Sequence, residues 1–431
     1  MTTRTLTVSA VPLTALLLAA TCSLEAAQLA GSVLAGGTQG GYADGRGAAA
    51  RFARITGIDT DAAGRVYVAD AGNARIRLVY PDGTVRTLAG TGETIPRDGT
   101  AATAAFGDLR RLGVDARGTC YVDDGNTLRR VDGSGAVTTL CSLAIPTGDR
   151  GSTWTDGYYE HAHTVDAFHT ITSLVVSPSG SVWACGVAHA ADLTIWPGIG
   201  GPKSDGTERT TNVVFAYVGT AWEPRLATTE VHSWAYYGGE FWGGEAILTV
   251  GKGRTNEIVL YVGDGGFALW NRHLDVLGAG GRWTFATVVP DPWPIDIAAV
   301  AWVSENEMLL HDRTGFSSAT RGAQLVPVSS TGTPGLGLAR GQYGLLYSAT
   351  ETAVLQFVPA GTVALALAAS EPPASTARLV ILAQPGDDIR VEQRSDLQSW
   401  SEMARLVSTG RDEQEVPVSG ALQFFRARFG P

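Results

Sequence analysis

The residues best suited to chemistry in this chain are two histidines separated by one residue, His161 and His163. In an extended strand, side chains two positions apart point to the same face, so the two imidazoles could bind the same metal ion. Glu160 and Asp166 lie close by in the sequence as further acceptors. A divalent cation is the cofactor that this spacing allows. A solvent-exposed loop is the commoner explanation of such spacing, so we assign no metal ligand.

Aromatic residues are the second chemical signal, because ten of the eleven tryptophans lie between residues 154 and 302. Aromatic faces beside polar loops suit the stacking of carbohydrate rings. The alternative is that large aromatics fill a wider core in this part of the chain. A Gly-rich stretch gathers Trp234, Tyr236, Tyr237, Phe241 and Trp242. The candidate ligand-binding residues are Trp154, Tyr158, His161, His163, His232, Trp234 and Tyr236.

Known catalytic motifs do not occur in the sequence. We find no nucleophile elbow, no phosphate-binding loop and no dinucleotide fingerprint. The glycine-rich stretch 36–41 precedes no predicted helix. We therefore assign no catalytic residue, and a binding role is favoured over an enzymatic one.

An internal repeat of 54 residues organises the first half of the chain and must position these residues. Four markers recur at this offset: Leu34 and Leu88, Asp44 and Asp98, Phe52 and Phe106, and Tyr67 and Tyr121. One segment, 57–59, corresponds to 113–115 at an offset of 56. A third unit carries an Asp-Gly pair at Asp156 and an Ala-Phe pair at Phe168.

Each unit predicts four short strands joined by Gly- and Asp-rich turns. In the first unit they span residues 55–59, 65–69, 75–80 and 84–89. A four-stranded antiparallel meander cannot bury both of its faces alone. Stacking such units around an axis buries them, so the sequence predicts an all-β propeller.

The run from Tyr67 through Asp70, Asn73 and Arg75 to Arg77 resembles the NHL repeat, as does the following Pro81-Asp-Gly segment. The second unit matches from Tyr121 to Arg129, one residue shorter. The resemblance covers residues 33–140 and implies a propeller. We expect the Asn to turn the chain, the arginines to pair with carboxylates or carbonyls, and the repeated Asp-Gly carboxylates to share a structural role in turns.

Beyond residue 200 the repeat is not visible by identity, although strand pairs remain at 257–262 with 267–270, 297–303 with 307–310, and 336–339 with 345–348. Residues 33–358 hold about six units of 54 residues, so we expect six blades, with five or seven as alternatives. We place the propeller at 28–361, a linker at 362–377 and a small β-module at 378–431. Strands are expected at 389–393, 404–407 and 424–429, with Trp400 as a core anchor. At this size the module is expected to dock on the propeller.

The first 27 residues resemble an export signal, because one charge at Arg4 precedes the apolar run 11–20 and small residues follow. Cys22 would allow a lipoprotein, but the residues before it match a lipobox poorly. We expect a secreted or periplasmic protein, and no later segment is long and apolar enough to span a membrane.

The chain carries 32 basic and 42 acidic residues, a net charge of −10. This field disfavours nucleic acid as a partner. Cys120, Cys141 and Cys185 remain after signal removal and lack metal-ligand spacing. They could form one disulfide plus a free thiol, or be three small buried side chains.

Two functions follow from these patterns. The first is a secreted binding or scaffold protein for a protein or carbohydrate ligand. The alternative is a metal-dependent propeller enzyme of lactonase or lyase type, which would need carboxylates and imidazoles converging at the mouth of the central channel, with His161, His163 and His232 as their best source.

Overall fold

The computed structural model of the 431-residue chain describes most residues from 30 onward. The described residues are 8–9, 30–147, 150–155, 160–196, 203–235, 239–253, 257–265, 271–288, 299–304, 307–311, 316–321, 325–329, 338–341, 345–358, 363–368, 376–383, 386–394, 400–409, 411–417 and 424–430.

The fold is all-β, as predicted. The described residues contain no α-helix, and their only helical turns are two 3₁₀ turns, η1 (Gly47–Ala49) and η2 (Ala71–Asn73). The chain is instead divided into short antiparallel strands, which group into sheets of consecutive strands.

Six four-strand units follow one another along the described chain, and we call them blades 1 to 6. Blade 1 holds β4 (Ile55–Thr60), β5 (Val66–Asp70), β6 (Arg75–Val79) and β7 (Thr84–Ala89), with β3 (Gly45–Arg46) beside β7. Blade 2 holds β8 (Leu109–Val114), β9 (Cys120–Asp124), β10 (Thr127–Val131) and β11 (Val137–Ser142). Blade 3 holds β15 (Phe168–Val176), β16 (Val182–Trp196), β17 (Lys203–Val218) and β18 (Ala221–Ala235).

The second half of the ring repeats this order. Blade 4 holds β19 (Gly239–Lys252), β20 (Ile258–Gly265), β21 (Asn271–Gly278) and β22 (Gly281–Val288). Blade 5 holds β23 (Ala299–Ser304), β24 (Glu307–His311), β25 (Phe316–Thr320) and β26 (Leu325–Ser329). Blade 6 holds β27 (Leu338–Arg340), β28 (Leu346–Ala349), β29 (Ala353–Val358) and the N-terminal strand β2 (Ala30–Gly36).

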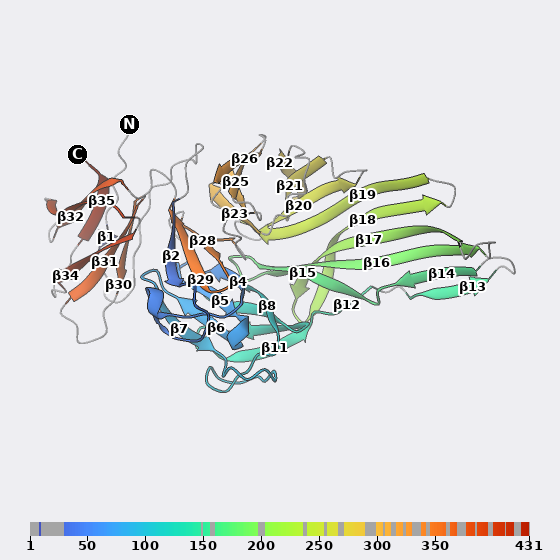
Figure 1. Cartoon of the computed structure of the whole chain (residues 1–431), viewed down its shortest axis with the longest axis horizontal. Helices are drawn as coiled ribbons and strands as arrows, with labels where there is room; N and C mark the ends of the chain where they lie inside the picture. The colour runs from blue at the N-terminus through green and yellow to red at the C-terminus, as the bar shows by residue number, and fades with distance from the viewer. Residues whose placement is uncertain are drawn as a thin grey trace.

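The first strands of the blades contact one another in a closed circle. β4 contacts β8, β8 contacts β15, β15 contacts β19, β19 contacts β23, β23 contacts β27, and β27 returns to β4. Because β2 pairs with β29, the two ends of the propeller sequence share blade 6 and close the ring (Figure 1). The chain is therefore a β-propeller, and the ring has six members within the residues described.

Apolar side chains fill the spaces between neighbouring blades. One cluster joins blades 1 and 2 through Ile76 and Phe106, and another joins blades 3 and 4 through Val214 and Leu260. Similar clusters lie between blades 2 and 3 and between blades 4 and 5. Blades 1 to 5 thus bury apolar faces against their neighbours, a burial that a single meander could not achieve alone.

Equivalent turns follow the first strands of blades 1, 2 and 3. Asp61 Oδ1 accepts from two backbone N–H groups of its turn, and Asp115 Oδ1 does the same 54 residues later. Ser177 takes this position in blade 3, where its Oγ accepts from Ser181 N. The repeat therefore keeps an offset of 54 here, and the predicted offset of 56 is wrong: Asp59 corresponds to Gly113.

These turns are also bonded to one another. Ala62 N donates to Ala116 O at 3.2 Å, and Ala116 N donates to Pro178 O at 2.9 Å. The three residues occupy the same position in successive turns. Proline has no N–H, so Pro178 cannot pass this hydrogen bond on to blade 4.

The strands of blades 3 and 4 run far beyond the ring and form an arm (Figure 1). β16, β17, β18 and β19 are 14 to 16 residues long, and β18 pairs with β19, so the two blades join into one 11-stranded sheet. A hairpin of β13 (Ser152–Thr155) and β14 (Glu160–Val165) extends the arm, because β14 pairs with the outer half of β16. The short β12 (Ile145–Pro146) pairs with β15.

The C-terminal residues form two further sheets, at the end of the molecule away from the arm (Figure 1). One contains β30 (Ala364–Ala368), β31 (Thr376–Leu382) and β34 (Arg411–Pro417). The other contains β32 (Asp388–Arg394), β33 (Ser401–Val407), β35 (Phe424–Phe429) and β1 (Val8–Ser9). The stretch 362–377 differs from the expected linker, because its alternating Ala-Leu segment forms β30 and pairs with β31.

This C-terminal part packs on the propeller. Val380 and Leu382 are fully buried in the same cluster as Val79 and Val358 of blades 1 and 6. Arg411 Nη1 donates to Pro81 O at 3.0 Å, and Arg46 pairs with Glu413. Docking is therefore observed, and it covers the seam where the ring closes.

Strands of the later blades lie where the sequence predicted them. β23 and β24 match the expected pair at 297–303 and 307–310, and β27 and β28 match the pair at 336–339 and 345–348. The pair expected at 257–262 and 267–270 is only half testable, because 266–270 lie outside the described residues. The first strand of this pair is observed as β20, which continues to Gly265.

Candidate functional site

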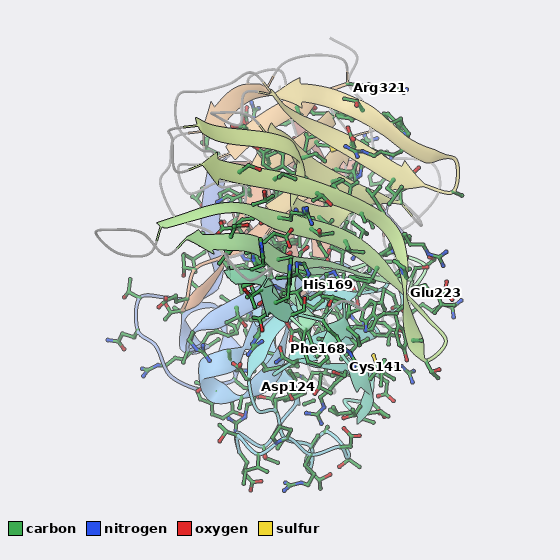
Figure 2. The ribbon with its side chains drawn as sticks, turned by 90° about the vertical axis from the view of Figure 1, so that its right-hand side faces the viewer. Asp124, Cys141, Phe168, His169, Glu223 and Arg321 are labelled. Carbon is green, nitrogen blue, oxygen red and sulfur yellow. The ribbon has the colours of Figure 1, made fainter. Side chains whose placement is uncertain are left out.

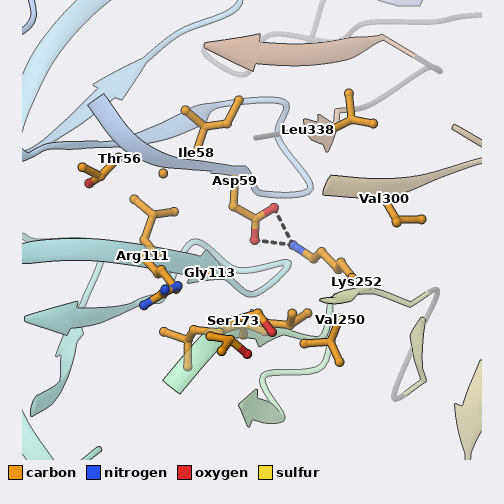
Figure 3. Close-up of a pocket in the computed structure, with 17 residues that line it drawn as sticks. Thr56, Ile58, Asp59, Arg111, Gly113, Ser173, Val250, Lys252, Val300 and Leu338 are labelled. Atoms are coloured by element: carbon orange, nitrogen blue, oxygen red, sulfur yellow. Dashed lines mark hydrogen bonds and ion pairs between the residues drawn. The ribbon is translucent and has the colours of Figure 1, made fainter. Parts of the chain in front are cut away.

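The central channel is one candidate site, because the first strands of all six blades bring side chains together there (Figure 3). It contains a cavity of about 220 Å³. Most lining side chains are apolar: Ile58, Leu112, Leu174, Val175, Val176, Val250, Val300 and Leu338. The polar ones are Thr56, Asp59, Arg111, Thr172, Ser173 and Lys252.

Glycines on the channel strands let neighbouring blades approach closely. A Cβ added to Gly113 would lie 2.6 Å from Val176 Cγ2 on the next blade, and one on Gly251 would lie 3.1 Å from Val300 Cβ. The close approach narrows the channel and leaves little room for side chains inside it.

One ion pair crosses the channel. Lys252 Nζ donates to Asp59 Oδ2 at 2.8 Å and to Asp59 Oδ1 at 3.0 Å, and also to the carbonyl of Val114 at 2.7 Å (Figure 3). Asp59 further accepts from the backbone N–H groups of Thr60 and Val114. The ammonium thus takes the place that a cation would need at this carboxylate.

Metal ligands do not converge in the part of the chain that the structure describes. No group of three or more His, Cys, Asp or Glu side chains there could hold a metal ion. In the channel, Asp59 is the carboxylate of the lining and it is already bonded to Lys252. Within the described channel, Asp59 and Lys252 are therefore bonded to each other, and Arg111 is bonded to Asp123 Oδ2.

A buried arginine lies at the centre of blade 1. Arg77 Nη1 donates to Asp70 Oδ2 at 2.8 Å, and Nη2 donates to Asp44 Oδ1 at 2.6 Å. Asn73 Nδ2 also donates to both oxygens of Asp70. Burial raises the pKa of the Asp70 carboxyl, while the hydrogen bonds from Ala53 N, Asn73 and Arg77 act in the opposite direction. The predicted arginine–carboxylate pairing is confirmed, and Asp44 has the expected structural role.

Blade 2 repeats this arrangement. Arg129 donates to Asp124 Oδ2 at 2.7 Å and to Asp98 Oδ1 at 2.8 Å, and also to the carbonyl of Ala105. The spacing from Asp124 to Arg129 is two residues shorter than that from Asp70 to Arg77, not one as predicted. Asp98 serves the same role as Asp44, whereas Asp156 lies outside the described residues.

Blade 3 replaces the buried pair with aromatic contacts. The strand register puts Gly186 where the buried Asp would be and Phe215 where the arginine would be. The His169 ring meets the Phe215 ring edge-on at 5.2 Å, and His169 Nδ1 lies 3.3 Å from the carbonyl of Ile145. Burial lowers the pKa of His169, although the hydrogen bond to Ile145 opposes this.

The phenylalanine of the third Ala-Phe pair, Phe168, does not have the structural role of its counterparts in the first two units. Phe52 and Phe106 are fully buried, whereas Phe168 is 53% exposed (Figure 2). The neighbouring His169 is buried in its place. In blades 1 and 2 the phenylalanine ring packs against the buried arginine, but blade 3 has Phe215 at that arginine's position, and there the strand turns its other face inward.

The predicted ligand residues Trp154, His161 and His163 lie together on one face of the arm. The rings of Trp154 and His161 stack with centroids 5.2 Å apart and planes 11° from parallel. Trp154 is 52% exposed, so stacking leaves part of the indole open to solvent. His161 Nδ1 lies 3.2 Å from Thr194 Oγ1 on β16.

A charged cluster lies beside this stack. His163 Nδ1 is 2.6 Å from Asp192 Oδ1, and the other oxygen of Asp192 is 3.2 Å from Arg209 Nη1. His161 and His163 are two residues apart on β14 and share a face. The stack and the cluster therefore lie on one surface, built from β13, β14, β16 and β17, which we call the arm face.

The other predicted ligand residues are not joined to this surface by the described contacts. Tyr158 and Tyr236 lie outside the described residues. His232 and Trp234 are in β18, where their register partners on β17 are Glu208 and Gly206. In the cross-strand register, Asp192 pairs with Thr207, and Thr207 pairs with Ser233. The row of paired residues that starts at His163 therefore ends on β18 at Ser233, between His232 and Trp234 in the sequence. The predicted set is therefore brought together only in part.

Three functional candidates were missed from the sequence: Lys252, Asp192 and Arg209. Lys252 lies beyond residue 200, where the repeat is not visible and its place on a channel strand could not be deduced. Asp192 and Arg209 sit in polar, alternating strands whose pairing depends on the register of β16 and β17. The only signal in the sequence is the alternation of polar and apolar residues at 192–195, which is typical of a strand with one solvent-exposed face.

The three thiols do not form a disulfide in the described chain. Cys120 and Cys185 are buried and Cys141 is half-buried, and all three are free. Burial raises the pKa of Cys185 to about 11. Among the described residues, no helix is long and apolar enough to cross a membrane.

The ring and the arm define this chain as a β-propeller protein with an extended sheet. No protein-family model and no curated protein sequence matches it. Similar solved structures include virginiamycin B lyase from Staphylococcus aureus, at 11% identity over 77% of this chain and 99% of that chain, TM-score 0.39. A gluconolactonase from Xanthomonas campestris matches at 16% identity over 77% and 97%, TM-score 0.37.

An auxiliary nutrient binding protein from Bacteroides thetaiotaomicron matches at 9% identity over 77% of each chain, with a TM-score of 0.31. These similarities are too distant to carry an argument about what this chain binds or converts. Function must be inferred from the two candidate sites.

Proposed function

We propose that this protein is an extracytoplasmic binding protein whose ligand contacts the arm face. The observation that carries the proposal is the half-exposed Trp154, held against His161 beside the His163–Asp192–Arg209 cluster. An ordered aromatic side chain beside fixed polar groups is a typical recognition surface.

The channel supports a binding role over the alternative, a metal-dependent enzyme of lactonase or lyase type. Asp59, the carboxylate of the described lining, is bonded to Lys252. A catalytic channel would instead hold carboxylates or imidazoles available to a metal or a substrate.

We also infer that the propeller is of NHL type and that the chain is exported. Support for the first comes from the Asp–Asn–Arg geometry of blade 1 and its counterpart in blade 2. Support for the second is the apolar run 11–20 with small residues after it. Protein sequencing of the N-terminus after expression in a bacterium tests the export signal: a start near residue 28 is expected, and an intact N-terminus in the cytoplasm contradicts it.

The binding proposal is tested with an array that carries both glycans and peptides. Thr194→Arg places a bulky side chain beside the stacked rings and should abolish specific binding whatever the ligand class. Ser134→Arg, in an exposed turn of blade 2, is the matched control and should bind as the wild type does. Binding that survives Thr194→Arg would refute a ligand site on the arm face.

A further inference from the structure

We infer that the ligand of the arm face is a neutral carbohydrate, with Trp154 as its stacking platform and the His163–Asp192–Arg209 cluster as the group that holds its hydroxyls. This inference rests on the proposed function and names the ligand class of the same surface. Each part of the arm face contributes one requirement of sugar recognition.

The first requirement is an aromatic plane with one open face. His161 stacks nearly parallel on one face of the Trp154 indole and fixes its orientation. The exposed remainder of the ring faces solvent, as its 52% exposure indicates. A pyranose ring presents a face of C–H groups, which packs on such a plane at little entropic cost because the indole is already ordered.

The second requirement is a polar group with both donors and acceptors in fixed positions. Asp192 is held from two sides, by His163 and by Arg209. Arg209 is nearly half exposed and contacts Asp192 Oδ2 through Nη1, so its planar guanidinium has further N–H groups to donate. A carboxylate oxygen accepts a hydrogen bond from a hydroxyl, and a guanidinium N–H donates one to the neighbouring hydroxyl. Both bonds are charge-assisted, so together the two groups can bind vicinal hydroxyls.

The third point is charge, which separates a neutral sugar from an anionic one. Asp192 and Arg209 cancel each other, and the carboxylate lies between the imidazole and the guanidinium. A sulfate, phosphate or carboxylate group would meet the repulsion of Asp192 as well as the attraction of Arg209, and so would lose its hydration without a net gain from charge. A polyol has no such penalty, so the cluster favours a neutral ligand.

The surface between the two groups suits a polar ligand better than an apolar protein partner. Four hydroxyl side chains occupy positions on this face in the same cross-strand rows: Ser152, Thr194, Thr207 and Ser233. Thr207 Oγ1 and Ser233 Oγ lie 3.3 Å apart and extend the polar surface toward β18. A hydrophobic protein partner would leave these hydroxyls desolvated without bonds.

The test measures binding of neutral oligosaccharides of gluco-, galacto-, manno- and xylo-configuration by titration calorimetry. We expect at least one to bind wild type, with a loss of about tenfold or more in Trp154→Ala and partial recovery in Trp154→Phe. Arg209→Gln should lose a similar factor. Trp283→Ala is the matched control, since Trp283 is 40% exposed on blade 4, away from the arm face, and should bind unchanged.

The outcomes separate the inference from the proposed function. Sugar binding that is equal in wild type and Trp154→Ala overturns the stacking site. Binding that depends on Trp154 but is found only with peptides or with sulfated and carboxylated sugars overturns the neutral-carbohydrate class and leaves the arm as a binding surface. No arm-dependent binding to any of these probes refutes both.

Discussion

Lys252 on β19 donates to both carboxylate oxygens of Asp59 on β4, at 3.0 and 2.8 Å, across the central channel. The same ammonium reaches the carbonyl of Val114 on β8 at 2.7 Å. One side chain of blade 4 is therefore bonded to blades 1 and 2. This pair therefore links three blades across the channel, in addition to the apolar clusters that join neighbouring blades.

We predict that Lys252→Met destabilises the propeller by about 2 kcal/mol. The substitution leaves the Asp59 carboxylate partly buried without its counter-charge, and breaking a fully buried pair costs ~3–5 kcal/mol. Lys252 is partly exposed, so the loss should be smaller. Urea unfolding followed by circular dichroism measures it. In the double variant with Asp59→Asn, the total loss should be smaller than the sum of the single losses, and additive losses would contradict the pair.

We predict that Arg77→Met and Arg129→Met each cost about 3–5 kcal/mol or prevent folding, because each leaves two carboxylates without their guanidinium. Both arginines are fully buried, and each bonds one buried and one half-exposed aspartate. The melting temperature reports the loss. Arg97→Met is the control: its pair with Glu93 is exposed, so a change within about 1 kcal/mol is expected. Equal effects at 77 and 97 would show that the buried network is not stabilising.

Blades 1 and 2 could be predicted from the sequence because their strands obey turn and ion-pair chemistry that repeats locally. Asp61 and Asp115 mark the same turn 54 residues apart, and Arg77 and Arg129 satisfy the same carboxylate positions. Each of these residues makes the same hydrogen bonds in both units, so the same amino acid occurs at the corresponding position of each unit. Blade 3 shows the limit, since Phe215 and His169 replace that chemistry and leave no repeated polar residue to find.

The arm face could be predicted only in part. The spacing of His161 and His163 correctly predicted that the two imidazoles share one strand face, whereas the pairing of Trp154 with His161 was not predicted. Their partners Asp192 and Arg209 come from β16 and β17, whose lengths of 15 and 16 residues exceed that of every strand of blades 1 and 2. The register of such long polar strands cannot be deduced from the residue pattern of one sequence, because a shift by two residues keeps the same faces.

The stability of the protein should fall as the solution becomes acidic, with His169 contributing. Burial lowers the native pKa of His169 below the ordinary value near 6.5, so between these values the unfolded chain binds more protons. The free energy of unfolding therefore decreases as the pH drops from about 6.5 through the native pKa, and is unaffected by this residue above that window. His169→Phe should reduce the difference in urea midpoint between pH 7.5 and pH 5, and His189→Phe, at an exposed position, should not. An unchanged difference in His169→Phe would contradict this contribution.

Thiol labelling should distinguish the three cysteines in the chain that begins at residue 28. The thiolate is the reactive form, and burial raises the pKa of Cys185 to about 11 and that of Cys120 further still. At pH 8 neither should react with a disulfide reagent in the folded protein, whereas half-buried Cys141 should react slowly. In denaturant all three should react, and Cys141→Ser should remove the native signal alone. Only one reactive thiol in denaturant would reveal a disulfide, and rapid labelling of two in the native state would contradict the burial of Cys120 and Cys185.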